Sequence, residues 1–482
     1  MKQQRKVKIL ATLGPASCEQ ETIQNLHEAG ADLFRINMSH TSHAMMRELI
    51  ARIRRVEKRR GRPIGILVDL QGPKPRIGEF EKGVADLEEG RGFTLDVDDR
   101  PGDAKRVHLP HAEILSAVKP GHRLLIDDGR LKLVAEECDG ESILCKVVSG
   151  GKIADRKGVS LPDTALPPGS LGEKDRADLD AALANGQVDW LALSFIQRPQ
   201  DIIGMSEIVR GRVAIMAKIE KPQAVQRLDE IVQLADAVMI ARGDLGVELP
   251  LEAVPGIQKQ IIRACRLAGK PVVVATQMLE SMVQAPIPTR AEVSDVANAV
   301  YEGADAIMLS AESASGAYPV EAVSMMGSSA WRVELDPNYP AIMDAQRPPP
   351  EPTQADAISL AVRRIAETLN LTAIVCYTAS GATGIRTSRE RPPTPILALS
   401  PIVETARRLS VAWGLHCVVT PDASGLEDMV ARASLATREQ GFGKPGDRII
   451  ISAGVPFGTP GATNMVRIAG IDGDDGAGAI TP

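Results

Sequence analysis

The chain has 482 residues, of which 44% are hydrophobic and 24% are charged, a composition typical of a globular protein of about three domains. Its 56 basic and 62 acidic residues give a net charge of −6, and only 3% of residues are aromatic. Both facts argue against a nucleic-acid-binding surface. No apolar run reaches the ~18 residues of a membrane-spanning helix, and the basic, polar N-terminus does not resemble a secretory signal.

The six cysteines are scattered along the chain, and none forms a Cys-x-x-Cys pair. Several lie within apolar runs, which favours reduced, buried thiols over zinc ligation or a disulfide framework. Because reduced thiols are typical of the cytosol, we expect a cytoplasmic protein.

Eight short aliphatic runs alternate with longer amphipathic stretches, which predicts strand–helix units and a parallel sheet. Near-continuous hydrophobicity within each run indicates strands that are buried on both faces. Eight such units predict an α/β fold with a closed (β/α)8 TIM barrel, formed by residues 1–71 and 169–345. The runs are residues 7–13, 32–37, 64–69, 190–195, 213–220, 237–244, 271–278 and 306–310.

Residues 72–168 interrupt this repeat with alternating apolar and polar residues, as in 93–97, and with Asp-Gly and Gly-Gly turn signals. The pattern predicts a small all-β domain, a β-barrel lid inserted into one barrel loop. A lid on the side where the barrel strands end would exclude water from a site there.

A proline-rich connector at residues 347–352 follows the barrel. Beyond it, a helical stretch and four apolar runs predict a C-terminal doubly wound α/β domain over residues 354–472. These runs are residues 372–377, 395–399, 416–420 and 448–452. We expect the Gly- and Asp-rich tail, residues 473–482, to be disordered.

Charged side chains gather where the predicted barrel strands end, which is the face at which such barrels carry their chemistry. Lys218 and Glu220 are two residues apart and share one face of their strand, and Asp244 follows the neighbouring strand. Two carboxylates without nearby His or Cys suit Mg²⁺ or Mn²⁺, and a lysine beside them suits a transferring phosphoryl group or an enolate. A structural ion pair is the alternative.

Two arginines near the strand ends, Arg35 and Arg76, offer planar guanidinium groups that suit phosphate. Neither a Walker A nor a G-x-G-x-x-G motif occurs, so a nucleotide would be held in another way.

Several long motifs resemble the pyruvate kinase family, and the similarity covers essentially the whole chain in family order. They include residues 11–17 (ATLGPAS), 34–40 (FRINMSH), 218–220 (KIE), 239–248 (MIARGDLGVE), 275–282 (ATQMLESM) and the run from 288 to 312. The resemblance implies transfer of the phosphoryl group of phosphoenolpyruvate to ADP, which gives pyruvate and ATP in the last step of glycolysis. It also implies a homotetramer.

The resemblance assigns the metal and phosphoryl chemistry to four side chains. Glu220 and Asp244 would be the ligands of Mg²⁺ or Mn²⁺. Lys218 would stabilise the transferring phosphoryl group and the enolate, and Arg35 would contact phosphate.

Substrate and nucleotide contacts are assigned in the same way. The backbone at Gly243 and Asp244, with Thr276, would hold the substrate, and Thr276 with a water is the candidate route for protonating the enolate. The nucleotide would lie against Asn37, His40, Arg76 and Lys157. Lys157 belongs to the lid segment 156–159 (RKGV).

One segment departs from the family members that use K⁺. The resemblance places their K⁺ ligands at Asn37, Ser39, Asp69 and the carbonyl of Leu70, but Leu70 replaces a threonine, and Lys74 replaces a glutamate. An ammonium at position 74 can supply the positive charge of K⁺, so the chain resembles the K⁺-independent branch. The alternative is that Lys74 points to solvent and K⁺ still binds.

The loop of residues 378–384 (TASGATG) follows a predicted strand and opens a helix. Its hydroxyls, those of Thr378, Ser380 and Thr383, could cradle a phosphate at the helix N-terminus. Because family members bind phosphorylated effectors in this domain, we expect a phosphorylated-metabolite effector and allosteric regulation. An ordinary capped strand–helix turn is the alternative.

Two other functions stay open at this point. Another barrel enzyme acting on pyruvate or phosphoenolpyruvate enolates, such as an aldolase or mutase, would need the metal site but neither Lys157 nor ADP. A metabolite-sensing module without activity would keep the fold, although no catalytic-type position is visibly lost.

Overall fold

The computed structural model describes residues 5–73, 75–165, 172–184, 186–455 and 463–471. Lys74 and the tail, residues 473–482, therefore lie outside the described residues, and the predictions made for them stay predictions. Within the described part of the chain, no helix has the length and apolar content needed to span a lipid bilayer. The six cysteines are unpaired, and Cys145, Cys265, Cys376 and Cys417 are buried.

Eight parallel strands close into a barrel in the order β1-β16-β15-β14-β13-β12-β3-β2, which confirms the predicted TIM barrel. Nearly every strand residue is buried, because helices cover the outer face and facing side chains fill the interior. The strands are β1 (Lys8–Leu13), β2 (Leu33–Asn37), β3 (Gly65–Asp69), β12 (Trp190–Leu193), β13 (Ala214–Ile219), β14 (Ala237–Ala241), β15 (Val272–Ala275) and β16 (Ala306–Leu309).

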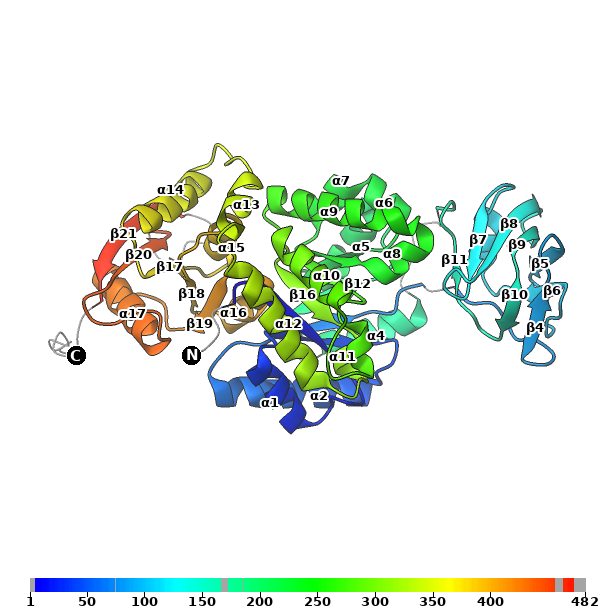
Figure 1. Cartoon of the computed structure of the whole chain (residues 1–482), viewed down its shortest axis with the longest axis horizontal. Coiled ribbons are helices and arrows are strands. Elements are labelled where there is room, and N and C mark those ends of the chain that lie inside the picture. The colour runs from blue at the N-terminus through cyan, green and yellow to red at the C-terminus, as the bar shows by residue number, and fades with distance from the viewer. Residues whose placement is uncertain (1–4, 74, 166–171, 185, 456–462, 472–482) are drawn as a thin grey trace.

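The helices of this part of the chain surround the barrel (Figure 1). Their amphipathic faces pack on the outer side of the strands. They are α1 (Gln20–Ala29), α2 (His43–Arg60), α4 (Glu173–Leu183), α5 (Pro199–Val209), α6 (Pro222–Gln226), α7 (Leu228–Leu234), α8 (Arg242–Glu248), α9 (Val254–Ala268), α10 (Arg290–Tyr301), α11 (Ala311–Ala314), α12 (Pro319–Glu334) and α13 (Tyr339–Ala345), with 3-10 turns η1 (Leu251–Ala253) and η2 (Glu280–Val283).

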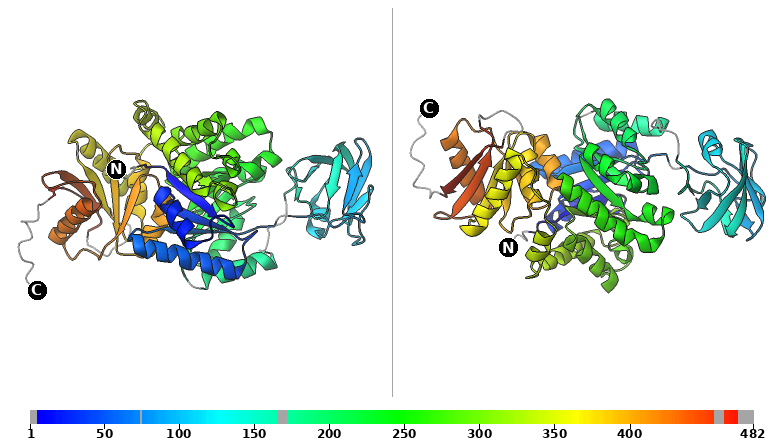
Figure 2. Two further views of the ribbon diagram at one scale, coloured as in Figure 1. Left: turned by 60° about the horizontal axis from the view of Figure 1, so that its bottom comes forward. Right: turned by 90° about the horizontal axis from the view of Figure 1, so that it is seen from above.

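The segment between β3 and β12 folds into β-sheets with a hydrophobic core of their own, which includes Phe93, Leu124 and Leu133. One sheet pairs β10 with β4, and the other has the order β11-β7-β8-β9-β5-β6. This insert lies at one end of the molecule in all views (Figures 1 and 2). Its elements are β4 (Val84–Leu87), β5 (Gly92–Asp96), β6 (Arg106–His108), α3 (Ala112–Ala117), β7 (Arg123–Ile126), β8 (Leu131–Cys138), β9 (Ser142–Ser149), β10 (Gly151–Ala154) and β11 (Val159–Ser160).

The C-terminal part forms an α/β sheet in the order β19-β18-β17-β20-β21. The sequence predicted four of these strands; β21, an antiparallel edge strand paired with β20, was missed because Arg467 and its exposed neighbours break the apolar pattern. The elements are α14 (Gln354–Thr368), β17 (Ala373–Tyr377), α15 (Ala382–Arg389), β18 (Ile396–Ser400), α16 (Val403–Arg408), η3 (Leu409–Val411), β19 (Leu415–Val419), α17 (Leu426–Glu439), β20 (Arg448–Ala453) and β21 (Met465–Gly470).

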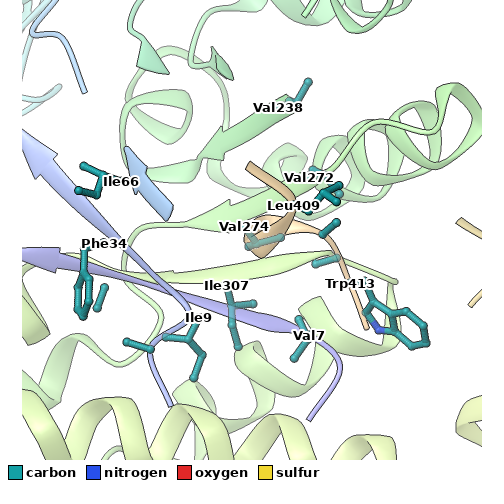
Figure 3. Packing of buried hydrophobic residues seen from close by; sticks show 14 of the residues in the cluster. Val7, Ile9, Phe34, Ile66, Val238, Val272, Val274, Ile307, Leu409 and Trp413 are labelled. Atoms are coloured by element: carbon teal, nitrogen blue, oxygen red, sulfur yellow. The ribbon is translucent and has the colours of Figure 1, made fainter. Parts of the chain in front are cut away.

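The C-terminal domain packs on the end of the barrel away from the insert (Figures 1 and 2). Leu409 and Trp413 lie beside the barrel residues Val7 and Val272 (Figure 3), and Trp413 is only 1% exposed. The Trp413 backbone N–H donates to Asp305 Oδ1 over 3.1 Å. These contacts make the apolar core continuous between the two domains.

We predict that Trp413→Ala lowers the free energy of unfolding by about 3–5 kcal/mol, because a large buried ring leaves a cavity. Urea unfolding followed by circular dichroism measures the change. The matched control, Leu435→Ala, removes a side chain that is 46% exposed, and it should change stability by less than about 0.5 kcal/mol. Equal effects of the two variants would contradict the placement of Trp413 between the domains.

Candidate active site

The ends of three adjacent barrel strands bring a lysine and two carboxylates together. Lys218, near the end of β13, places its Nζ 2.8 Å from Glu220 Oε1 and 3.4 Å from Asp69 Oδ1, at the end of β3. The same Nζ donates to Ser194 Oγ, after β12, over 2.8 Å. Lys218 and Glu220 therefore share one face of the strand end, as their spacing predicted.

Arg35, on β2, extends this cluster around the barrel mouth. Its Nε donates to Asp69 Oδ2 over 2.7 Å, and its Nη2 lies 2.7 Å from the same oxygen. Its Nη1 donates to Thr12 Oγ1, on β1, over 3.2 Å. Asp69 thus holds Arg35 and Lys218 in fixed positions, which leaves two cations side by side at the strand ends.

The carboxyl groups of this cluster have shifted pKa values. Burial alone would raise the pKa of Asp69, but Lys218 and Arg35 outweigh burial and hold it below its ordinary value. Burial raises the pKa of Glu220 to about 6, where the attraction of Lys218 opposes the shift and the charge of Asp244 adds to it. Burial would lower the pKa of Lys218, but Asp69 and Glu220 raise it, so the ammonium stays charged.

The cluster around Glu220 carries more carboxylates than cations. Three carboxylates, Asp69, Glu220 and Asp244, share two cations, Lys218 and Arg35. A divalent cation between Glu220 and Asp244 would relieve this imbalance. No cluster of three or more His, Cys, Asp or Glu side chains in the described residues could hold a metal by itself, so such an ion would take further ligands from substrate and water, as Mg²⁺ commonly does.

Asp244 and Thr276 come to the site from the segments after the next two strands, β14 and β15. The sequence predicted that both residues belong to the strands themselves, but both strands end earlier. The run 237–244 ends as a strand at Ala241, and residues 242–248 form α8; the run 271–278 ends at Ala275. The cause is Arg242, whose guanidinium pairs with Asp295 over 2.6 Å and donates to the Thr276 carbonyl over 2.7 Å. This contact turns both chains away from the sheet.

Thr276 has a positive φ of 70°, a backbone conformation that costs free energy in a β-branched residue and marks functional sites. The Gly243 backbone N–H donates to its Oγ1 over 2.8 Å. The structure therefore brings Gly243, Asp244 and Thr276 together at one edge of the barrel mouth.

Sequence reasoning missed Asp295, because no local pattern connects α10 with the end of β14.

Two of the residues predicted to contact a nucleotide lie at the end of β2: Asn37 is the last residue of the strand, and His40 belongs to the loop that follows it. Asn37 Oδ1 accepts a hydrogen bond from the Ser39 backbone N–H over 3.1 Å, and the His40 N–H donates to the Asn37 carbonyl over 3.2 Å. Ser39 and His40 are exposed. The Leu70 carbonyl accepts from Ser194 Oγ over 2.9 Å.

The other two, Arg76 and Lys157, lie side by side where the insert joins the barrel, because Ile77 N donates to the Lys157 carbonyl over 3.0 Å. Arg76 Nη1 donates to the Arg156 carbonyl over 2.9 Å. Lys157 Nζ lies 2.8 Å from Asp127 Oδ1, within the insert. In this structure their charges therefore face the insert rather than the Lys218 cluster.

In the C-terminal loop, all three predicted hydroxyls have partners inside the protein, and that of Ser380 is the weakest, with the Ala382 N–H donating to Ser380 Oγ over 3.5 Å. Thr378 Oγ1 accepts from the Gly381 N–H over 2.8 Å, and Thr383 Oγ1 lies 2.7 Å from Thr463 Oγ1. Ser380 is exposed. The contact of Thr378 is that of a capped strand–helix turn, whereas the contact of Thr383 joins the helix to the segment before β21.

A barrel with a buried lysine, an arginine and paired carboxylates at its strand ends defines an enzyme that acts on a small anionic, phosphorylated or enolic substrate. Comparison with known proteins narrows this class. Residues 4–323 match the model of the pyruvate kinase barrel domain, and residues 356–469 match that of the pyruvate kinase alpha/beta domain. The chain therefore belongs to the pyruvate kinase family of phosphotransferases.

Individual relatives agree with this assignment. The chain is 57% identical to a pyruvate kinase of Methylorubrum extorquens over 97% of this chain and 98% of the relative. It is 48% identical to a pyruvate kinase of Agrobacterium vitis over 96% of this chain and 98% of that protein. The crystal structure of a pyruvate kinase from Cryptosporidium parvum superposes with a TM-score of 0.91 at 33% identity, covering 97% of this chain and 96% of the other.

We predict that Lys218→Met lowers the free energy of unfolding by about 3 kcal/mol or more, because it leaves Asp69 and Glu220 buried with one cation fewer. The control is Lys146→Met, at an exposed position of the insert, which should have little effect. Urea unfolding measures both. A Lys218→Met protein as stable as the control would show that the cluster carries no buried charge imbalance.

Proposed function

We propose that this protein transfers the phosphoryl group of phosphoenolpyruvate to ADP and so produces pyruvate and ATP. The observation that carries the proposal is the Lys218 ammonium, buried between Asp69 and Glu220 at the strand ends of a chain that belongs to the pyruvate kinase family. A structural ion pair alone would need neither the arginine that Asp69 also holds nor the second carboxylate, Asp244, whose charge reaches Glu220.

The substrate would be held by cations and backbone amides around one pocket. Arg35 and Lys218 would pair with its phosphate, and the backbone at Gly243 and Asp244, with Thr276, would hold its carboxylate end. Because Asp69 already fixes Arg35 and Lys218, little reorganisation is needed when the substrate arrives.

A divalent ion, Mg²⁺ or Mn²⁺, would be held by Glu220 and Asp244, where it would neutralise charge on the substrate oxygens. In the transfer, an oxygen of the ADP β-phosphate forms a bond to phosphorus while the bond from phosphorus to the enol oxygen breaks. Lys218 stabilises the electron pair left on that oxygen. A proton is then added to the methylene carbon, and Thr276 with a water is the proposed route.

The nucleotide would lie between the loop after β2 and the insert, against Asn37, His40, Arg76 and Lys157. Support comes from the position of Arg76 and Lys157 on adjoining segments at the base of the insert. A movement of the insert toward the barrel would carry both charges onto the phosphates and exclude water. The Lys157–Asp127 pair would have to open for this.

A coupled assay for pyruvate tests the proposal. Release of pyruvate only when phosphoenolpyruvate, ADP and Mg²⁺ are all present supports it. Product formation from phosphoenolpyruvate without ADP would indicate an aldolase or mutase, and the absence of turnover would indicate a sensing module.

We predict that Glu220→Gln raises the Mg²⁺ concentration needed for half-maximal rate by about 100-fold or more, because it removes a charged ligand of the ion. Glu321→Gln, at an exposed position of α12, is the control and should leave the Mg²⁺ response unchanged. An unchanged Mg²⁺ response of Glu220→Gln would remove Glu220 from the metal site.

We also propose that activity does not require K⁺. Asp69, one of the K⁺ ligands expected from the family, is already neutralised by Arg35 and Lys218, and the Leu70 carbonyl already accepts from Ser194. Lys74 would supply the remaining charge, and a second cation close to it would be repelled.

Turnover is therefore expected to be the same in K⁺ and in tetramethylammonium buffers of equal ionic strength. Lys74→Glu should make the rate depend on K⁺, because it restores the carboxylate of K⁺-using members. A large drop in the turnover of the unmodified protein when tetramethylammonium replaces K⁺ would reject the proposal.

The remaining family features are proposals as well: a homotetramer, a cytoplasmic location, and regulation by a phosphorylated metabolite at the loop of Thr378, Ser380 and Thr383. Ser380 is the residue of this loop best placed for a ligand, because it is exposed and its one internal hydrogen bond, from the Ala382 N–H over 3.5 Å, is longer than those of Thr378 and Thr383.

A further inference from the structure

Phe195, two residues after the end of β12, adopts a backbone conformation that is rare for a large side chain. Its φ of 58° lies in the left-handed region, which costs free energy in a residue with a bulky side chain. Such residues persist where the surrounding structure fixes them, and they cluster at functional sites. The Phe195 backbone N–H donates to Glu220 Oε2 over 2.6 Å. The strained turn therefore directs a hydrogen-bond donor at a carboxylate of the candidate metal site.

The two carboxylate oxygens of Glu220 have different partners. Oε1 lies 2.8 Å from Lys218 Nζ, and Oε2 accepts from the Phe195 N–H. Because both oxygens are engaged, the carboxylate is held in one orientation, while each oxygen keeps a lone pair for a metal ion. A residue that orients a metal ligand in this way contributes to metal affinity without touching the metal, commonly by about 10- to 100-fold. Phe195 is thus placed to set the orientation of Glu220.

The Phe195 ring also contacts the segment that connects β3 with the insert. Gly72, on this segment, has a φ of 72°, and a Cβ atom there would lie 2.8 Å from Ser194 Cβ and 3.0 Å from Phe195 Cδ2. Only a glycine fits this conformation at such a close approach. The Gly72 N–H donates to Asp175 Oδ1, at the start of α4, over 3.1 Å. The segment is thereby held against the turn of Ser194 and Phe195.

Lys221 and Gln223 link the same ring to the segment that returns from the insert. Lys221 directly follows the candidate metal ligand, and its Nζ lies 5.9 Å from the centroid of this ring. The same ammonium lies 2.6 Å from Glu248 Oε1, at the end of α8, and both side chains are buried. Gln223 Nε2, in the first turn of α6, donates to the Pro162 carbonyl, just after β11 of the insert, over 2.9 Å. The returning segment is therefore tied to the stretch that follows the candidate metal ligand.

Both connections of the insert thus meet the short stretches that hold Glu220. The outgoing segment lies against Ser194 and Phe195, and the returning segment is bound two residues beyond Lys221. Close-packed interiors have low compressibility and transmit small displacements. A displacement of the connection at Gly72 would therefore move the Phe195 N–H relative to the carboxylate that it orients.

We propose that Phe195 is a positioning residue that couples the placement of the insert to the binding of the divalent ion. Its N–H orients Glu220 for the ion, and its ring transmits the placement of the connection at Gly72. The coupling is reciprocal, so an ion at Glu220 favours the placement of the insert that keeps this hydrogen bond. The inference rests on the proposed function, in which Glu220 is a metal ligand and the insert moves.

Titration of the full-length protein with Mn²⁺ tests the coupling, with the free ion measured by electron paramagnetic resonance, phosphoenolpyruvate present and ADP absent. Gly72→Ala should weaken Mn²⁺ binding by about tenfold or more, because the added methyl group displaces the turn of Ser194 and Phe195. The matched control is Gly90→Ala in the insert, where φ is 78° and a Cβ would meet no described atom within 4 Å beyond its chain neighbours. It carries a similar backbone strain and should leave the Mn²⁺ affinity unchanged.

Phe195→Ala gives a second test, because Phe195 is only partly buried and the variant keeps the backbone N–H. It should also weaken Mn²⁺ binding by about tenfold. Gly72→Ala should then add less than its full effect in the Phe195→Ala protein, since the two residues act in series. Equal Mn²⁺ affinities of Gly72→Ala and Gly90→Ala, or independent effects of Gly72→Ala and Phe195→Ala, would overturn the proposal.

The result is separable from that of the pyruvate assay, because the titration requires no turnover. Pyruvate formation together with equal Mn²⁺ affinities of the two glycine variants would reject the coupling alone. The expected variant effects on Mn²⁺ binding without pyruvate formation would reject the proposed reaction and keep the coupling. Absence of Mn²⁺ binding by the unmodified protein would overturn both the coupling and the metal site.

Discussion

The Lys218 ammonium, buried between Asp69 and Glu220, is the interaction on which the rest of the site depends. A buried charge is tolerated only when opposite charges lie within a few ångströms, and three adjacent strand ends supply them. Closure of the eight strands into a barrel is what brings β3, β12 and β13 side by side. The barrel therefore serves the chemistry by holding cations in place before any substrate arrives.

The excess of carboxylates over cations in the cluster explains why it can bind a divalent ion and does not serve only to stabilise the fold. Asp69 is satisfied by two cations, whereas Glu220, whose burial raises its pKa to about 6, pairs with one cation, Lys218, and feels the charge of Asp244. One carboxylate thus fixes the cations, and the other two are left for a divalent ion. The same chain uses its opposite barrel end to carry the C-terminal domain, through Trp413 and its apolar neighbours (Figure 3).

Much of the fold could be predicted from sequence, because eight buried strands leave eight apolar runs, and Lys218 and Glu220 share a face by their spacing alone. The turn of the chain after Ala241 and after Ala275 could not be predicted from sequence, because it depends on the contact between Arg242 and Asp295, which are 53 positions apart. β21 was missed because an exposed edge strand needs no apolar run. The domain limits at residues 71/72 and 168/169 stay predictions. The contact between Phe195 and Gly72 also left no signal, since the two residues meet only in the folded chain.

The central claim is that Glu220 and Asp244 hold a divalent ion beside the Lys218 ammonium. Anomalous X-ray diffraction from crystals grown with Mn²⁺ tests it most directly, because Mn²⁺ can be located independently of any assay. The account predicts a strong anomalous peak within about 2.3 Å of one carboxylate oxygen of Glu220 and one of Asp244. A peak bound elsewhere, or none at these two carboxylates with substrate present, would contradict it.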